Sequence, residues 1–474
     1  MKTKNLLYFL PLLALVACEP EFDDMNYSGG SADFSRMVAV GNSLTAGYQS
    51  NALSKSGQIN SIPNILAEQL KNAGGGAFKQ PLLTGKAGEI GAGTDLILQG
   101  KVVPALSLTM STDCKGKTSL GPKVIKAPYL YDGTNGFKGS VAAAGPYNNV
   151  GVPGAKLTHL NFAGYAAANP YFARFTTSPS QTVIENAMMS NHTFFTLWIG
   201  NNDVLTYALS GGDEGGDNIT SAGVFTALYK QTLDSLTKNG QKGVLANIPN
   251  ITDIPFFTTI PYKGAVVERQ QDLDALNAAY GPYNAGLDQV VQQNPAFETE
   301  ANLRKINFQL GANAFIILDN TLTDLSGNGL PSIRQIKAGE LITLRTPQDS
   351  LKCAGWGTSK PIPGNYTLIK SEVDDIVNAV GAYNNIIKTE AQSRGLAFVD
   401  ANKRLRELKK GIVISGISFN SEMVTGGAFS LDGVHPSNRG YAVLANDFID
   451  AINSTYGAAV PKVNVASYSN IEVE

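Results

Sequence analysis

Histidine is scarce in this sequence, which has three among 474 residues: His159, His192 and His435. A reaction that needs an imidazole as general base therefore has three candidates. The sequence also lacks a Gly-x₄-Gly-Lys-[Ser/Thr] phosphate loop, a Gly-x-Gly-x-x-Gly fingerprint, a His-Glu-x-x-His motif and paired Cys-x-x-Cys motifs. These absences argue against the common nucleotide-binding and zinc-binding classes.

The sequence also has no excess of positive charge, because it contains 37 Lys and Arg and 39 Asp and Glu, which gives a net charge of −2. No basic face is indicated, and we expect no nucleic-acid partner. After the first residues, no apolar run reaches the ~18 residues that a membrane-spanning helix needs. The 43% hydrophobic content is enough for a sizeable globular core, and 49 glycines indicate many loops.

The N-terminus has the three parts of a secretory signal. Lys2 and Lys4 form a charged region, residues 6–16 are apolar, and the segment ends at Cys18. This end resembles a bacterial lipobox, which implies a signal peptide over 1–17 and acylation of Cys18. Several acyl chains on one residue give stable anchoring. The alternative is an ordinary signal peptide with an incidental cysteine.

Residues 18–32 are acidic and then Ser/Gly-rich, as in a solvated tether. The acidic part resembles a surface-export signal of bacterial lipoproteins, although a plain charged spacer fits equally well. We therefore expect a protein of the bacterial cell envelope, held at the outer membrane by its lipid, on either the periplasmic or the exposed face.

Two further cysteines, Cys114 and Cys353, lie in polar, glycine-containing surroundings. An exported protein meets an oxidising compartment, so a disulfide between them is slightly favoured over two free thiols. Such a bridge would close a long loop and add roughly 4–5 kcal/mol in the chain-entropy model.

Apolar strands and amphipathic helices alternate along the chain. Strands are predicted at 37–40, 193–199, 244–248 and 396–400, and helices at 61–73, 222–238, 372–393 and 438–455. Near-continuous apolar strands in this order predict an α/β fold with a parallel, doubly wound sheet. Residues 33–460 form the predicted domain, with insertions at about 74–148 and 255–365. Residues 461–474 are expected to be a C-terminal tail.

Ser43 follows the first predicted strand, at the sheet edge where open α/β sheets bind their ligands. A serine there can be a nucleophile if a base lies nearby, or it can simply cap a helix. His435 precedes the last helix, and Asp432 lies three residues before it. A carboxylate that orients an imidazole is what activation of a serine requires, although the two could also pair for structural reasons only. His159 and His192 resemble surface or boundary residues.

Two further strand ends carry candidate oxyanion donors. Asn202 lies in the Gly-Asn-Asn-Asp sequence that ends at Asp203, and its side-chain amide could donate a hydrogen bond. Gly154 could donate its backbone N–H. The alternative is that both are ordinary turn residues.

Together these stretches resemble the four blocks of the SGNH/GDSL hydrolase family. The matching stretches are Gly41 to Leu44, Gly154, Gly200 to Asp203 and Asp432 to His435. The resemblance implies a flavodoxin-like three-layer α/β/α sandwich with a parallel five-stranded sheet. It also implies an esterase or lipase that works through an acyl-enzyme, without a metal or organic cofactor.

The resemblance also assigns roles. Ser43 is the nucleophile and one oxyanion donor, Gly154 and Asn202 are the other donors, and His435 is the base with Asp432 as its orienting acid. Asn42 stands where the family usually has Asp, and Pro153 stands where a small polar residue is common. Neither position supplies a catalytic atom.

The leading hypothesis is thus an envelope-anchored hydrolase of carboxylic esters, with a lipid or an acylated glycan as its substrate. A carbohydrate O-acetyl esterase of the same fold is the alternative within this class. A surface lipoprotein that binds glycan or lipid without turnover, or a structural envelope protein, would explain the anchor but not the four blocks.

Overall fold

The computed structural model describes residues 26–83, 105–124 and 140–470. The predicted signal peptide, Cys18 and the first part of the tether lie outside these residues. Among the described residues, no helix is long and apolar enough to cross a membrane.

The core of the protein is a five-stranded parallel sheet. Its strands are β1 (Met37–Gly41), β4 (Asn149–Gly151), β5 (Phe194–Trp198), β6 (Lys242–Ala246) and β13 (Ala397–Val399). They lie in the order β4-β1-β5-β6-β13, which is 2-1-3-4-5 in order of sequence. The direction of winding changes between β1 and β5. Such a switch point leaves a crevice at the carboxyl ends of the strands, where doubly wound sheets bind ligands.

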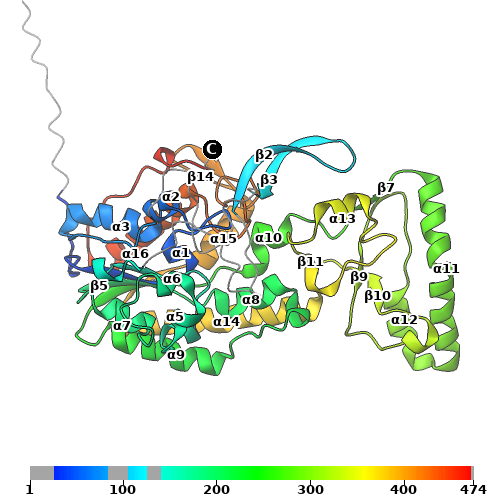
Figure 1. Ribbon diagram of the computed structural model, residues 1–474, viewed down its shortest axis with the longest axis horizontal. Coiled ribbons are helices and arrows are strands. Elements are labelled where there is room, and N and C mark those ends of the chain that lie inside the picture. Colours follow the sequence, from blue (N-terminus) through cyan, green and yellow to red (C-terminus); the bar gives the residue numbers. More distant parts are fainter. Residues whose placement is uncertain (1–25, 84–104, 125–139, 471–474) are drawn as a thin grey trace, which may run out of the picture.

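Helices cover both faces of this sheet, as the continuous apolar strands predict. One face carries α3 (Ile62–Leu70) and α16 (Asn438–Tyr456), which pack on each other. The other carries α7 (Val183–Met188), α9 (Ala222–Leu236) and α14 (Lys370–Ser393) (Figure 1). The structure therefore confirms a mixed α/β fold with a five-stranded parallel sheet between helices.

The folded domain extends beyond both predicted boundaries. Ser28 pairs with Ala459 in a β-bridge, so the last residues of the predicted tether belong to the domain. At the other end Val465 is fully buried, and the backbone N–H of Arg439 bonds to the carbonyl of Ser469. The predicted tail therefore packs against α16 as far as it is described.

The first predicted insertion contains a hairpin of β2 (Leu106–Thr112) and β3 (Thr118–Val124). The start of this segment packs on the sheet domain, because Leu83 is buried in the main core and Arg174 donates hydrogen bonds to the carbonyls of Pro81 and Leu82. In Figure 1 the hairpin stands out from the sheet domain.

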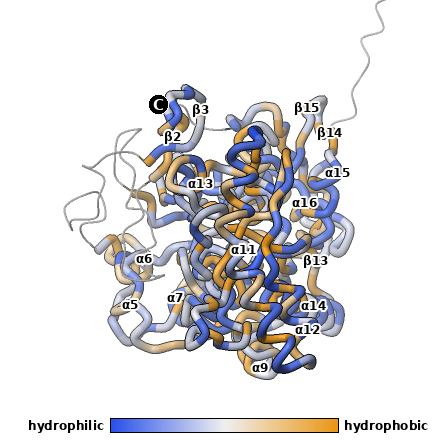
Figure 2. The backbone as a smooth tube through the Cα atoms, turned by 90° about the vertical axis from the view of Figure 1, so that its right-hand side faces the viewer, coloured by the Kyte–Doolittle hydropathy of each residue, from blue (hydrophilic) through white to orange (hydrophobic). Residues whose placement is uncertain are grey.

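The second predicted insertion is a subdomain with its own core. It contains α11 (Gln270–Gln293), α12 (Glu298–Arg304) and the strand pairs β7 (Ala265–Val267) with β8 (Gly311–Asn313) and β9 (Ile316–Leu318) with β10 (Ile333–Gln335). Apolar side chains of these elements form clusters separate from the main core. In Figure 2 the outer side of this subdomain is toward the viewer, and hydrophilic and hydrophobic stretches alternate along α11.

A disulfide connects the two insertions. Cys114, in the turn of the hairpin, is bonded to Cys353 at the end of α13 (Gln348–Cys353). A salt bridge of 3.2 Å between Asp113 and Lys352 lies beside it. The hairpin tip is thus fixed to the subdomain.

Candidate active site

Three parallel strands bring the predicted site residues to one edge of the sheet. Gly41 of β1 lies opposite Gly151 of β4 and Trp198 of β5. Ser43, Gly154 and Asn202 each follow one of these positions by two to four residues. Because parallel strands end at the same edge, the register alone places all three near the switch point.

Ser43 is the first residue of α1 (Ser43–Ala46), a single turn that begins where β1 ends. The turn is capped by Asn42, whose side-chain oxygen accepts a hydrogen bond from the N–H of Leu44 at 3.0 Å. The first N–H groups of a helix have no partner within the helix. The N–H of Ser43 is such a group and is available to an anion.

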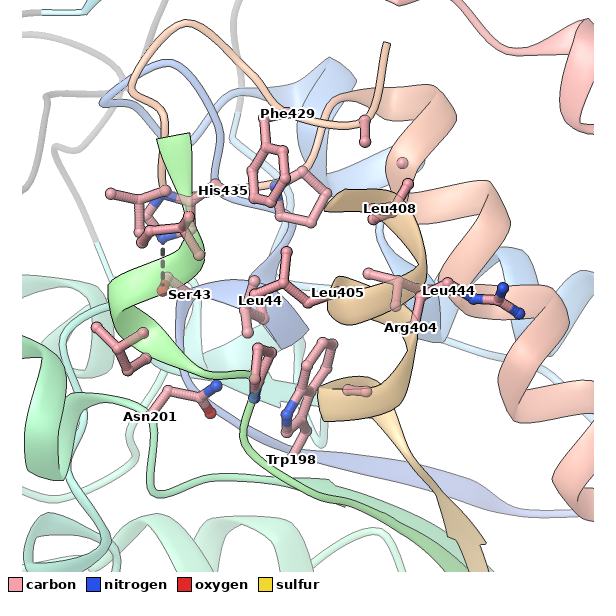
Figure 3. Close-up of a pocket in the computed structure, with 18 of the residues that line it drawn as sticks. Ser43, Leu44, Trp198, Asn201, Arg404, Leu405, Leu408, Phe429, His435 and Leu444 are labelled. Atoms are coloured by element: carbon pink, nitrogen blue, oxygen red, sulfur yellow. Dashed lines mark hydrogen bonds between the residues drawn. The ribbon is translucent and has the colours of Figure 1, made fainter. Parts of the chain in front are cut away.

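A continuous chain of hydrogen bonds runs from Ser43 to Asp432. The hydroxyl oxygen of Ser43 lies 2.9 Å from Nε2 of His435, and Nδ1 of His435 lies 3.0 Å from Oδ2 of Asp432 (Figure 3 shows the first of these bonds). Since a carboxylate accepts hydrogen bonds only, Nδ1 carries the proton and Nε2 is free to accept from the serine. This arrangement can deprotonate Ser43.

Asp432 is buried and heavily hydrogen-bonded. Its Oδ1 accepts from the N–H groups of Val434 and His435 and from the Ser430 hydroxyl, and its Oδ2 accepts from the N–H of Asn51. Burial raises the pKa of this carboxyl, but the His435 imidazole and these hydrogen bonds outweigh it and hold the pKa below its ordinary value. Asp432 therefore stays ionised beside His435.

Sequence reasoning missed the segment that delivers the Asn51 bond. Ser50 and Asn51 both have left-handed backbone conformations, with φ of 52° and 62°. Such conformations are uncommon outside glycine and cluster at functional sites. They turn the N–H of Asn51 toward Asp432 and the N–H of Ser50 toward the Ser430 hydroxyl at 2.9 Å. The sequence marks these positions only weakly, because a single sequence does not show which asparagine is left-handed.

Tyr48 also supports the histidine, with its ring centroid 4.7 Å from that of His435. The backbone carbonyl of Tyr48 accepts a hydrogen bond from the hydroxyl of Tyr441. Burial, followed by the Asp432 charge, raises the pKa of Tyr441, so this hydroxyl keeps its proton and remains a donor. The imidazole is thus packed from the side as well as bonded at both nitrogens.

Gly154 and Asn202 lie on the wall of the same cleft as Ser43 and His435. Gly154 has φ of 80°, a conformation that an L-residue rarely adopts. Asn202 begins α8 (Asn202–Ser210), and its amide nitrogen donates to the carbonyl of Ala155 at 2.9 Å. This bond uses one of the two amide hydrogens and ties α8 to the Gly154 loop. The second hydrogen remains as a potential oxyanion donor.

Asp203 holds the same loop in place. Its Oδ2 accepts from the N–H of Leu157 at 2.7 Å, and its Oδ1 accepts from the Thr220 hydroxyl at 2.8 Å. The side chain is fully buried, and burial raises its pKa to about 6 although both hydrogen bonds act in the opposite direction. None of these hydrogen bonds joins Asp203 to Ser43 or His435. Asp203 therefore acts as a positioning residue for the Gly154 loop.

A small apolar pocket of about 90 Å³ lies beside Ser43 and His435. Figure 3 shows aliphatic and aromatic side chains around it, from α1, from the end of β5, from α15 (Ala401–Lys410) and from α16. The labelled apolar residues are Leu44, Trp198, Leu405, Leu408, Phe429 and Leu444. The pocket has room for several methylene groups but not for a long chain.

A much larger cleft of about 1450 Å³ reaches the same serine from the other side. The hairpin β2–β3, the start of the subdomain and the loop that carries His435 line it. The two insertions therefore form walls of the site.

The other predicted residues lie elsewhere. His159 accepts a hydrogen bond from the N–H of Lys156 at its Nδ1, and burial, with some contribution from Lys156, lowers its pKa to about 4. His192 is buried rather than at the surface, and its Nε2 donates to the carbonyl of Leu236. Neither histidine contacts Ser43 in the bonds described. Cys114 and Cys353 are bonded to each other, and Cys18 lies outside the described residues.

Comparison of the sequence with protein-family models gives no match, and comparison with curated proteins gives no match either. The residues and their geometry therefore carry the functional proposal.

Proposed function

We propose that this protein is a serine-dependent hydrolase of carboxylic esters, of the SGNH/GDSL type. The observation that carries the proposal is the hydrogen-bonded chain from Ser43 through His435 to Asp432, at 2.9 and 3.0 Å. The strand order 2-1-3-4-5 and the flanking helices support a flavodoxin-like α/β/α sandwich of this type. The lipid anchor at Cys18 in a bacterial outer membrane remains part of the proposal.

The mechanism follows from the geometry. His435 takes the hydroxyl proton of Ser43, and the serine oxygen attacks the ester carbonyl. The N–H groups of Ser43 and Gly154 and the amide of Asn202 stabilise the oxyanion. The alcohol leaves with the proton from His435, and an ester bond to Ser43 remains. Water, deprotonated by His435, attacks this acyl-enzyme, and release of the acid restores the free serine.

The shape of the site favours an ester with an apolar acyl group over an acetyl ester. The small apolar pocket beside Ser43 exceeds the size of an acetyl methyl group. An apolar group that fills the pocket loses its contact with water, which stabilises the bound state by about 25 cal/mol per Å² of apolar surface buried.

Hydrolysis of p-nitrophenyl esters from acetate to laurate tests this proposal. We expect turnover by the wild-type protein and a loss of at least 10³-fold in Ser43→Ala. A rate that is highest for acetate would favour the carbohydrate O-acetyl esterase alternative. A folded wild-type protein no more active than Ser43→Ala on every ester would contradict hydrolysis and leave the binding lipoprotein.

A further inference from the structure

The β2–β3 hairpin has two chemically different faces. Residues alternate along both strands, and Leu106, Leu108 and Met110 of β2 lie opposite Val124, Pro122 and Leu120 of β3. All six are apolar and, by the period of two, point to one side of the hairpin. The intervening positions are Ser107, Thr109, Ser111, Ser119, Gly121 and Lys123. This second face is therefore polar.

Part of the apolar face is exposed, whereas Leu106, Leu108 and Pro122 are half-buried. Met110, Leu120 and Val124 are 64%, 56% and 53% exposed, respectively. The polar face is what we expect of a hairpin on the protein surface. Neighbouring exposed apolar residues, in contrast, mark an interaction site. Their regular alternation makes chance an insufficient explanation.

Most of this face lines the cleft that reaches the reactive serine. Leu106, Leu120, Pro122 and Val124 line the cleft together with Ser43 and His435, whereas Leu108 and Met110 do not. On the polar face Gly121 lines the cleft, but Ser111, Ser119 and Lys123 do not. Val266 of the subdomain lines the same cleft and is 61% exposed. The cleft thus has apolar lining residues from both insertions.

The hairpin is fixed at both ends. At its base, the N–H of Leu106 donates to the carbonyl of Ser50 at 2.9 Å, and Ser50 adjoins the Asn51 that bonds to Asp432. At its tip, the disulfide between Cys114 and Cys353 and the Asp113–Lys352 salt bridge attach it to α13. A surface held in this way keeps its position relative to the catalytic residues.

We propose that the apolar face of the β2–β3 hairpin binds a long hydrocarbon chain of the ester substrate. The inference rests on the proposed hydrolase function and narrows its substrate to lipid-like esters. The apolar pocket of about 90 Å³ takes only a short acyl group, so an acyl chain too long for this pocket lies in the cleft of about 1450 Å³ instead. There the hairpin offers it apolar side chains that otherwise face water.

Two double variants with matched positions test this assignment. Leu120→Ser with Val124→Ser removes apolar surface from the cleft wall. Ser111→Ala with Ser119→Ala changes a directly opposed pair on the polar face and is the control. None of the four residues belongs to the catalytic machinery, and all lie on the surface hairpin, so we expect melting temperatures close to the wild type.

For the cleft-wall variant, kcat/KM for p-nitrophenyl laurate should fall roughly 10- to 100-fold, mainly through KM. The value for p-nitrophenyl acetate, which does not reach the hairpin, should stay within about twofold of the wild type. The control variant should keep both values. Equal losses on both esters, or no loss on laurate, would overturn the proposal. Leu120→Thr gives a milder change if the double variant does not fold.

A binding measurement separates this inference from the hydrolase proposal. Laurate binding to the Ser43→Ala protein, measured by calorimetry, does not require turnover. We expect binding that weakens by at least tenfold when Leu120→Ser and Val124→Ser are added. If laurate binds in this way but no ester is hydrolysed by the wild type, the hydrolase proposal fails and the hairpin assignment stands as a binding site. If esters are hydrolysed and laurate binds equally well with and without the hairpin substitutions, the hairpin assignment is wrong and the hydrolase proposal is unaffected.

Discussion

Replacement of Asp432 by asparagine isolates the role of one oxygen atom. The two side chains have nearly the same shape, but the amide has one acceptor oxygen and one NH₂ donor. The Oδ1 position of Asp432 accepts two backbone N–H groups and a hydroxyl, whereas Oδ2 accepts the N–H of Asn51 and Nδ1–H of His435. The amide oxygen is therefore expected at the Oδ1 position, and the NH₂ group at the Oδ2 position.

This orientation inverts the hydrogen bonding of the histidine. An NH₂ group at the Oδ2 position donates to Nδ1, so the proton of the neutral imidazole moves to Nε2. Nε2, which lies 2.9 Å from the Ser43 hydroxyl, can then no longer accept the serine proton. Loss of the correct tautomer in such a triad costs roughly 10³–10⁴ in kcat. The N–H of Asn51 also loses its acceptor, which costs about 1–3 kcal/mol of stability.

The assay is steady-state hydrolysis of a p-nitrophenyl ester by wild type, Asp432→Asn and Ser430→Ala. Ser430→Ala removes one donor to the Asp432 carboxylate without affecting the imidazole tautomer, and we expect its kcat to fall by less than tenfold. A kcat for Asp432→Asn within tenfold of the wild type, from a folded protein, would refute the assigned role of the carboxylate.

Three further results are expected. Asn202→Ala should lower kcat by roughly 10²–10³ and change KM little, because it removes an oxyanion donor; steady-state kinetics check this, and nearly full activity would exclude Asn202 from the oxyanion site. The pKa of Asp203 is raised to about 6 from 3.8, so its contribution to stability is fully present below pH 4 and is lost as pH rises through 6, by roughly 3 kcal/mol. Urea unfolding between pH 4 and 7 should show this decline in the free energy of unfolding, and the decline should be smaller in Asp203→Asn. The same pH dependence in wild type and Asp203→Asn would contradict the raised pKa of Asp203. Reduction of the disulfide between Cys114 and Cys353, which spans 239 positions, should lower the free energy of unfolding by up to roughly 5 kcal/mol. Thermal unfolding with and without reductant measures the effect, and equal melting temperatures would show that the bridge contributes no stability.

The strands and the reactive residues could be predicted because their signals are local. β1 and β5 are largely apolar runs; β1 ends at Gly41, which precedes Asn42, and β5 ends two residues before Gly200, which precedes Asn201. Parallel strands place such ends at one edge, so the positions of Ser43 and Asn202 follow from the strand pattern. His435 was identifiable because only three histidines were available and Asp432 stood nearby.

The supports of the site depend on contacts between distant segments. The bond from the N–H of Asn51 to Asp432 joins residues 381 positions apart. The pairing of Cys114 with Cys353 spans 239 positions and needed the fold to bring a hairpin tip to α13. No local pattern of residue types specifies either contact.

The β2–β3 hairpin shows a different limit of prediction from the sequence. Residues 106–112 alternate between apolar and polar side chains, which is a sequence signal for a strand. The surrounding segment is rich in glycine, proline and lysine, and this composition favoured the interpretation of a surface insertion over a core element. Shorter windows over 74–148 would have revealed the alternation, although not the cleft that it faces.

The most direct test of the central claim is covalent labelling of Ser43. Incubation with an organophosphate such as diisopropyl fluorophosphate, followed by peptide mass spectrometry, reports which serine is activated. We expect one adduct, on the peptide that contains Ser43, with labelling strongly reduced in His435→Gln and absent in Ser43→Ala. No adduct on the folded wild-type protein, or an adduct on another residue that persists in Ser43→Ala, would contradict Ser43 as the nucleophile.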